Sequence, residues 1–161
     1  MRVFKGVTMK RVKIGDVIEI ETEKGFYYAQ YTHKHPEFGA LIRIFDKGFS
    51  NRPKFLKDVL KLKVRFSIFF PLQAAISQGI FSVVGNEVVL PELQKFPIFR
   101  DGIADPNTKT VKNWWLWDGK NEWQVGELKE EQFKLPIREI WNDTLLIKRL
   151  ESGWTVEQDR I

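Results

Sequence analysis

Between Lys13 and Asp46, hydrophobic and polar positions alternate in three short runs that turn signals separate. In the first run, Ile18 and Ile20 fall on one face and the intervening glutamates on the other, which is the two-residue period of a half-buried strand. A Glu-Lys-Gly turn leads into an aromatic run, and a His-Pro break and a glycine lead into a third run. This pattern predicts three adjacent strands. We expect one buried layer made of Ile18, Ile20, Phe26, Tyr28, Ile42 and Ile44.

Shorter elements follow in the middle of the chain. Hydrophobic residues at helical spacing predict a short helix within 55–62, and alternating residues predict a strand over 63–70. A glycine in the first position of a two-residue turn favours a hairpin over 80–90, with its turn at Gly85 and Asn86.

The stretch 114–125 is typical of another hairpin, because an Asp-Gly pair separates two tryptophan-containing runs. A two-residue turn would place Trp114 opposite Trp123, whereas a four-residue loop would place Leu116 there. We favour the first register, since cross-strand aromatic pairs stabilise a sheet by up to ~1 kcal/mol. The preceding stretch, 91–113, contains three prolines and is expected to be irregular.

One helix is predicted near the C-terminus. Residues Asn142 to Thr144 offer an N-cap to a hydrophobic segment that Gly153 ends. Leu146 and Leu150 lie four residues apart and are expected to face the sheet. The residue just beyond a helix is commonly a glycine, because a left-handed backbone is needed there.

Together these patterns predict a mainly β protein. We expect a single domain over residues 1–161, in which antiparallel hairpins form a twisted sheet or a partly open barrel, with one short C-terminal helix and minor helical turns. The 161 residues include no cysteine, which excludes disulfides and fits a reducing compartment. No run approaches the ~18 hydrophobic residues of a membrane span, and the N-terminus has no signal-peptide pattern. The sequence therefore favours a cytoplasmic protein that does not contact membranes.

The net charge of +5 is unevenly distributed. Residues 1–85 contain 15 Lys and Arg against 7 Asp and Glu, whereas residues 86–161 contain 11 against 14. The basic excess is densest over 2–13 and 47–65. A basic half fits an anionic partner such as nucleic acid, but we favour the alternative, a solvated surface that keeps the protein soluble.

Few residues suggest chemistry. His33 and His35 would point the same way on a strand, and Glu37 lies near enough to join them, but this spacing is common in loops without metal. There is no nucleophile motif, no Gly-rich phosphate loop and no carboxylate matched to a histidine. We therefore expect no catalytic residue, no metal and no cofactor, and hence a protein that is not an enzyme.

The aromatic residues are the candidates for a binding site. Three tryptophans within four residues exceed what one face of a strand buries, because neighbouring side chains point to opposite sides. Either a second layer covers both faces, or some of the rings are exposed and serve as anchors for a partner, helped by the loop 99–113. The candidate partner-binding residues are Trp114, Trp115, Trp117, Trp123, Tyr27 and Tyr28.

Three stretches carry a resemblance to a known family. They read KIGDVIEI at 13–20, GFYYAQY at 25–31 and LPIREIWNDTLLIKRLESGW at 135–154. With these stretches the chain resembles the immunity protein 26 family of bacterial polymorphic-toxin systems. The resemblance implies a mostly β protein that binds and neutralises a cognate toxin, encoded nearby, in the cell that produces it. It implies no catalytic residues.

A second function stays open from the residues themselves. In it, the basic first half contacts phosphates, and Tyr27, Tyr28 or tryptophan rings stack on bases of a nucleic acid. The two functions differ in genome neighbourhood and in the salt dependence of binding to DNA or RNA.

Overall fold

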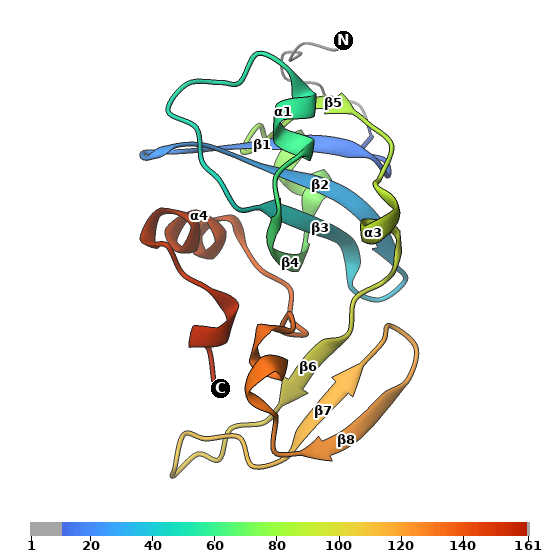
Figure 1. The fold of residues 1–161 in the computed structure, drawn as a ribbon, viewed down its shortest axis with the longest axis vertical. Coiled ribbons are helices and arrows are strands. Elements are labelled where there is room, and N and C mark those ends of the chain that lie inside the picture. The colour runs from blue at the N-terminus through green and yellow to red at the C-terminus, as the bar shows by residue number, and fades with distance from the viewer. Residues whose placement is uncertain (1–10, 161) are drawn as a thin grey trace.

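The computed structural model describes residues 11–160 and confirms the mainly β fold (Figure 1). Over these residues, eight strands form two antiparallel sheets and no closed barrel. Most of the basic stretch 2–13 lies outside the described residues. The five-stranded sheet has the order β4-β3-β2-β1-β5, with β1 (Asp16–Thr22), β2 (Gly25–His35), β3 (Gly39–Phe45), β4 (Val64–Phe70) and β5 (Ser82–Asn86).

The second sheet has three strands and lies at the lower end of the view in Figure 1. Its order is β6-β7-β8, with β6 (Phe99–Gly102), β7 (Trp114–Trp117) and β8 (Glu122–Gly126). The helical elements are α1 (Leu56–Leu60), α2 (Leu72–Ser77), α3 (Pro91–Gln94), η1 (Glu130–Lys134), α4 (Asp143–Ser152) and η2 (Val156–Gln158).

The buried layer of the large sheet differs from the expectation at β2. A two-residue turn pairs Thr22 with Gly25, so Ile18 lies opposite Ala29 and Ile20 opposite Tyr27. The predicted layer placed Phe26 and Tyr28 beside these isoleucines, and this register is wrong by one residue. A slip of one residue turns every side chain of a strand to the other face of the sheet. The first face of the sheet buries Ile18, Ile20, Ala29, Tyr31, Ile42 and Ile44 beneath α2, Trp141 and α4. The second face buries Val17, Tyr28 and Phe45 beneath α1.

The predicted hairpin over 80–90 is wrong. The strand β5 pairs with β1, which lies far from it in the sequence, and residues 87–90 form no strand. At β5, Gly85 leaves room for the side chain of Leu56 in α1, which a Cβ atom would meet. Long-range pairing with the free edge of β1 therefore overrides the local turn signal.

The tryptophan hairpin has the register that we did not favour. Leu116, and not Trp114, lies opposite Trp123. The Asp118 carboxylate accepts hydrogen bonds from the backbone N–H groups of Lys120 and Asn121, at 2.9 and 2.8 Å. This side-chain cap stabilises a four-residue loop, which sets the longer register.

The stretch 91–113 is less irregular than expected, because it contains α3 and the strand β6. β6 pairs with β7, and its outer edge is covered, since the Arg100 N–H donates to the Pro136 carbonyl and the Arg138 N–H donates to the Arg100 carbonyl. The two sheets share one core cluster, in which Leu41 and Phe69 of the large sheet pack against Phe99 and Trp117 of the small one.

The C-terminal helix is confirmed at both ends. The Asn142 side chain accepts a hydrogen bond from the Leu145 N–H at 2.8 Å, and Gly153 has a φ of 71° in the left-handed region. Leu146 and Leu150 are buried against the large sheet. The short helix α1 and the strand β4 also lie where the pattern predicts them.

Candidate functional site

The four tryptophans of the β7–β8 hairpin divide into two buried and two half-exposed rings. Trp114 and Trp117 are 3% and 4% exposed, whereas Trp115 and Trp123 are 38% and 40% exposed. Neither alternative for burial therefore holds for the whole set. Trp114 and Trp117 belong to the core, whereas Trp115 and Trp123 each leave part of the ring at the surface.

Trp117 joins the two sheets. Its ring centre lies 5.1 Å from that of Phe38, 5.4 Å from that of Phe99 and 5.0 Å from the imidazole of His35. The Arg138 guanidinium covers the ring at 4.3 Å from its centre. Trp117 is thereby enclosed, and a partner does not reach it.

Trp114 lies on the opposite face of β7, against the C-terminal part of the chain. Its ring contacts Phe133 edge to face, at 5.8 Å between ring centres. The fully buried Arg100 guanidinium lies 5.1 Å from the Trp114 ring centre. The two buried rings of β7 thus hold this strand on both sides.

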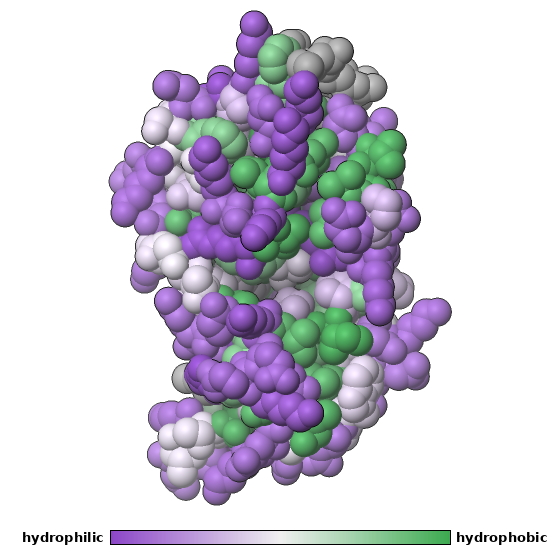
Figure 2. Space-filling view, viewed as in Figure 1, coloured by the Kyte–Doolittle hydropathy of each residue, from purple (hydrophilic) through white to green (hydrophobic). Residues whose placement is uncertain are grey.

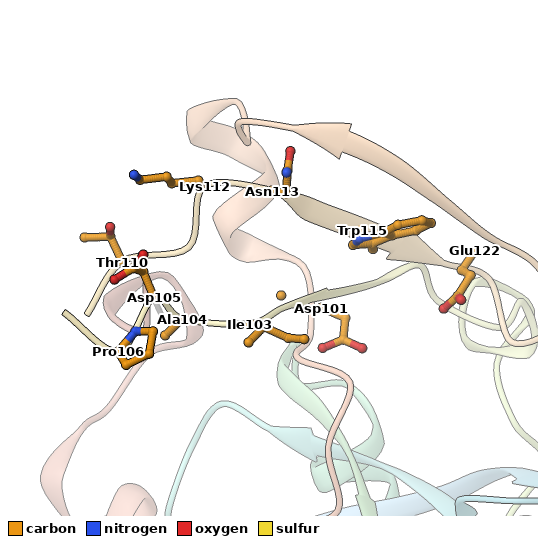
Figure 3. Close-up of a pocket in the computed structure, with 11 residues that line it drawn as sticks. Asp101, Ile103, Ala104, Asp105, Pro106, Thr110, Lys112, Asn113, Trp115 and Glu122 are labelled. Carbon is orange, nitrogen blue, oxygen red and sulfur yellow. The ribbon is translucent and has the colours of Figure 1, made fainter. Parts of the chain in front are cut away.

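Trp115 lies in a groove of about 500 Å³ (Figure 3). The groove is formed by the end of β6, the loop 103–113 and the exposed side of β7. Trp115 shares it with the Ile103 side chain, which is 92% exposed. Figure 3 shows Trp115, Glu122 and Asp101 at one end and Pro106 and Thr110 at the other. Figure 2 shows hydrophobic side chains reaching the surface over the lower part of the molecule, where Figure 1 places the small sheet.

The loop beside the groove is held by its own hydrogen bonds. The Asp105 carboxylate accepts from the N–H groups of Asn107 and Thr108, at 2.8 and 3.1 Å, and the Asp105 N–H donates to the Thr110 carbonyl. These N–H groups lower the pKa of Asp105, which favours its charged form. At the start of the loop, Gly102 has no room for a Cβ atom against Val111. The groove is therefore largely preformed.

The Trp115 end of the groove is acidic. Asp101 lies directly opposite Trp115 across β6 and β7, and Glu122 lies opposite Trp117. The Arg138 Nη1 atom lies 2.6 Å from a Glu122 oxygen and 3.8 Å from an Asp101 oxygen, so one cation is shared between two carboxylates. Figure 3 shows the Lys112 side chain extended away from Trp115. This end of the groove thus combines an aromatic ring with an excess of negative charge.

Tyr27 and Tyr28 are not part of this site. Tyr28 is fully buried, and its hydroxyl donates to a Glu19 carboxylate oxygen at 2.8 Å. Burial raises the pKa of Tyr28, and the Glu19 contact adds to this. Tyr27 packs partly buried against the core of the large sheet. Our prediction of Tyr28 as a contact residue is not supported, because β2 turns its ring inward.

The two histidines have internal partners. The His33 Nε2 atom lies 2.7 Å from the Gln94 carbonyl oxygen, and its Nδ1 atom lies 2.9 Å from the Thr32 hydroxyl. The His35 Nε2 atom lies 2.8 Å from the Gly119 carbonyl oxygen, and its Nδ1 atom accepts from two backbone N–H groups. Within residues 11–160, no group of three or more His, Asp or Glu side chains is arranged to hold a metal ion. Both histidines position neighbouring backbone, and His35 ties the β7–β8 turn to the large sheet.

Sequence reasoning included the loop 99–113 in the candidate site but singled out neither Asp101 nor Ile103 within it, and it missed Glu122. Ile103 carries the one signal that was available, since it is a large hydrophobic residue directly after an Asp-Gly pair in a polar loop. The two carboxylates become part of the site only through the pairing of β6, β7 and β8.

Comparisons of this chain with protein-family models, with curated proteins and with solved structures give no match. Over residues 11–160, the chain has no helix that is both long enough and apolar enough to cross a membrane.

Proposed function

We propose that this protein is a non-enzymatic immunity protein, which binds a cognate toxin and blocks it by occupying part of its surface. The groove at Trp115 is the contact site in this proposal. The family resemblance of the sequence supports this class of partner, and the exposed hydrophobic groove supports this position for the contact.

The observation that carries the proposal is the pair Trp115 and Ile103. A half-exposed tryptophan and an isoleucine that is 92% exposed meet in one groove, although nearby tryptophans of the same strand are buried. Large hydrophobic side chains grouped at a surface are typical of protein interfaces, where tryptophan is a frequent hot spot. The preformed loop lowers the conformational entropy that binding would lose.

Nucleic acid binding is supported less well. Arg43 and Arg65 belong to the basic half, but both guanidinium groups donate to backbone carbonyls within the chain. Burial lowers the pKa of Arg43 to about 10, and Ser67 and Thr32 are among its partners. Part of the positive excess therefore stabilises the fold, and Tyr28 offers no face for base stacking.

The proposal is tested by growth protection. The product of the adjacent gene is expressed in a host together with the parent protein, with Trp115→Ala or with Trp123→Ala. Trp123→Ala is the control, because Trp123 has a similar exposure on the other face of the hairpin. We expect the parent and Trp123→Ala to restore growth, and Trp115→Ala to restore it less. An adjacent product that is not toxic, or equal protection by all three proteins, would contradict the proposal.

A further inference from the structure

The groove face of β7 carries two tryptophans in equivalent positions, Trp115 and Trp117. They lie two residues apart, so both side chains project to the same side of the small sheet. Each ring has one carboxylate on a neighbouring strand, since Asp101 of β6 lies opposite Trp115 and Glu122 of β8 lies opposite Trp117. The same two chemical groups, an indole ring and a carboxylate, are therefore repeated along the strand.

At Trp117 this arrangement holds an arginine. The Arg138 guanidinium lies 4.3 Å from the ring centre, and its Nη1 atom lies 2.6 Å from Glu122. A guanidinium prefers such a site, because it stacks on an aromatic face and binds a carboxylate through its planar edge. The chain thus shows within itself which cation fits this surface.

At Trp115 the equivalent place is open. Among the described residues, no arginine or lysine lies over the Trp115 ring and no other aromatic ring packs on it. Its carboxylate, Asp101, lies 3.8 Å from Arg138, which is longer than a hydrogen bond, so it keeps capacity to accept from a second donor. The groove extends away from the ring over Ile103, which leaves space for the backbone that would carry such a donor.

We infer that the groove binds an arginine side chain of the partner protein, with its guanidinium stacked on Trp115 and hydrogen-bonded to Asp101. Ile103 then contacts a hydrophobic residue next to that arginine. Charge complementarity supports this occupant, because the second half of the chain has three more acidic than basic residues and the groove has two carboxylates beside its ring. The inference rests on the proposed function and specifies the chemistry of the contact.

The experiment is a titration followed by NMR of the tryptophan indole N–H groups in the full-length protein. The probes are three blocked tripeptides, acetyl-Gly-Xaa-Gly-amide, in which Xaa is arginine, lysine or citrulline. Citrulline has nearly the shape of arginine but no charge. We expect the arginine peptide to shift the Trp115 signal saturably, the lysine peptide to bind about threefold or more weakly, and the citrulline peptide to give no saturable shift.

Two variants locate the site. Asp101→Asn keeps the size of the side chain and removes its charge, and we expect it to weaken binding of the arginine peptide about fivefold or more. Trp123→Ala, on the opposite face, should leave this binding unchanged. Equal binding of arginine and citrulline peptides, shifts at Trp123 in place of Trp115, or unchanged affinity in Asp101→Asn would overturn the inference.

The inference and the proposed function fail in different ways. If the toxin binds the parent and loses affinity for Trp115→Ala but not for Asp101→Asn, the groove is the interface. The inference that it binds an arginine side chain of the partner is then wrong. If Trp115→Ala leaves toxin binding unchanged, the proposed function of the groove fails, whatever the peptides do.

Discussion

The guanidinium carbon of Arg100 lies 5.1 Å from the ring centre of Trp114, and Arg100 is fully buried. Its nitrogen atoms donate to the backbone carbonyls of Val156, at 2.9 Å, and of Leu135, at 3.3 Å. One arginine of β6 therefore links the small sheet to the C-terminal segment, and this link supports the strand that carries Trp115.

The first prediction concerns this link. Arg100→Leu should lower the free energy of unfolding by roughly 3 kcal/mol or more, since it leaves several buried carbonyls without a donor. Urea denaturation followed by tryptophan fluorescence measures the change. Arg100→Lys is the matched variant, because it keeps the charge but reaches fewer carbonyls. Its free energy of unfolding should lie between that of Arg100→Leu and that of the parent. Equal stability of all three proteins would show that Arg100 does not hold the C-terminal segment.

The second prediction separates core tryptophans from surface tryptophans. Trp117→Ala removes a ring from the cluster between the two sheets and should lower the free energy of unfolding by ~3–5 kcal/mol. Trp115→Ala removes a half-exposed ring and should lower it by about 1 kcal/mol or less. Chemical denaturation of the two variants tests this. Similar losses for both would mean that Trp115 is also a core residue.

The third prediction is a pH dependence that originates at His33. Burial lowers the pKa of His33 from its usual value of 6.5, so the folded protein binds fewer protons than the unfolded chain just below that pH. The stability that neutral His33 contributes is present above pH 6.5 and is lost as the pH falls through the lower, folded pKa. We expect the free energy of unfolding to decrease as the pH falls below the usual His33 pKa of 6.5.

His33→Asn provides the control for this effect. Glu139 acts in the opposite direction, because burial raises its pKa and protonation near its folded pKa stabilises the native state. That contribution is common to the parent and to His33→Asn, so it cancels in their difference. If the parent and the variant lose the same stability on acidification, His33 is not the group responsible.

The fourth prediction concerns the end of α4. Gly153 has a φ of 71°, and no other atom lies within 4 Å of the position that its Cβ would take. A substitution therefore acts through backbone conformation and not through a clash. Gly153→Val should destabilise by ~1 kcal/mol or more, whereas Gly153→Asn, which tolerates the left-handed region, should destabilise less. Equal melting temperatures for Gly153→Val and Gly153→Asn would contradict this explanation.

Much of the fold could be predicted from the spacing of hydrophobic residues. The alternation around Ile18 and Ile42 and the caps of α4 are local features, and the structure confirms the elements that they predict. The sequence did not show which residues of β2 face each side of the sheet, because this depends on the exact length of the turn before Gly25. β6 was missed for another reason: it has four residues, and it is a strand because β7 and the segment at Pro136 bond both its edges.

Only the general position of the candidate site could be predicted from the sequence. Adjacent tryptophans on a strand must point to opposite faces, which predicts that β7 does not bury every ring on one side. Trp115 and Trp117 share a face, however, and their different exposure arises because Phe38 of the β2–β3 turn and Phe69 of β4 cover only Trp117. That difference depends on how the two sheets pack, which no local pattern specifies.

The most direct test of the central claim is the dissociation constant of the complex with the adjacent gene's product, measured by calorimetry for the parent, Trp115→Ala and Trp123→Ala. We expect Trp115→Ala to weaken binding by ~2 kcal/mol, about thirtyfold, and to keep the fold. Trp123→Ala, of similar exposure, should change it by less than about threefold. Full affinity in Trp115→Ala, or a larger loss in Trp123→Ala, would contradict the claim that the groove at Trp115 is the binding site.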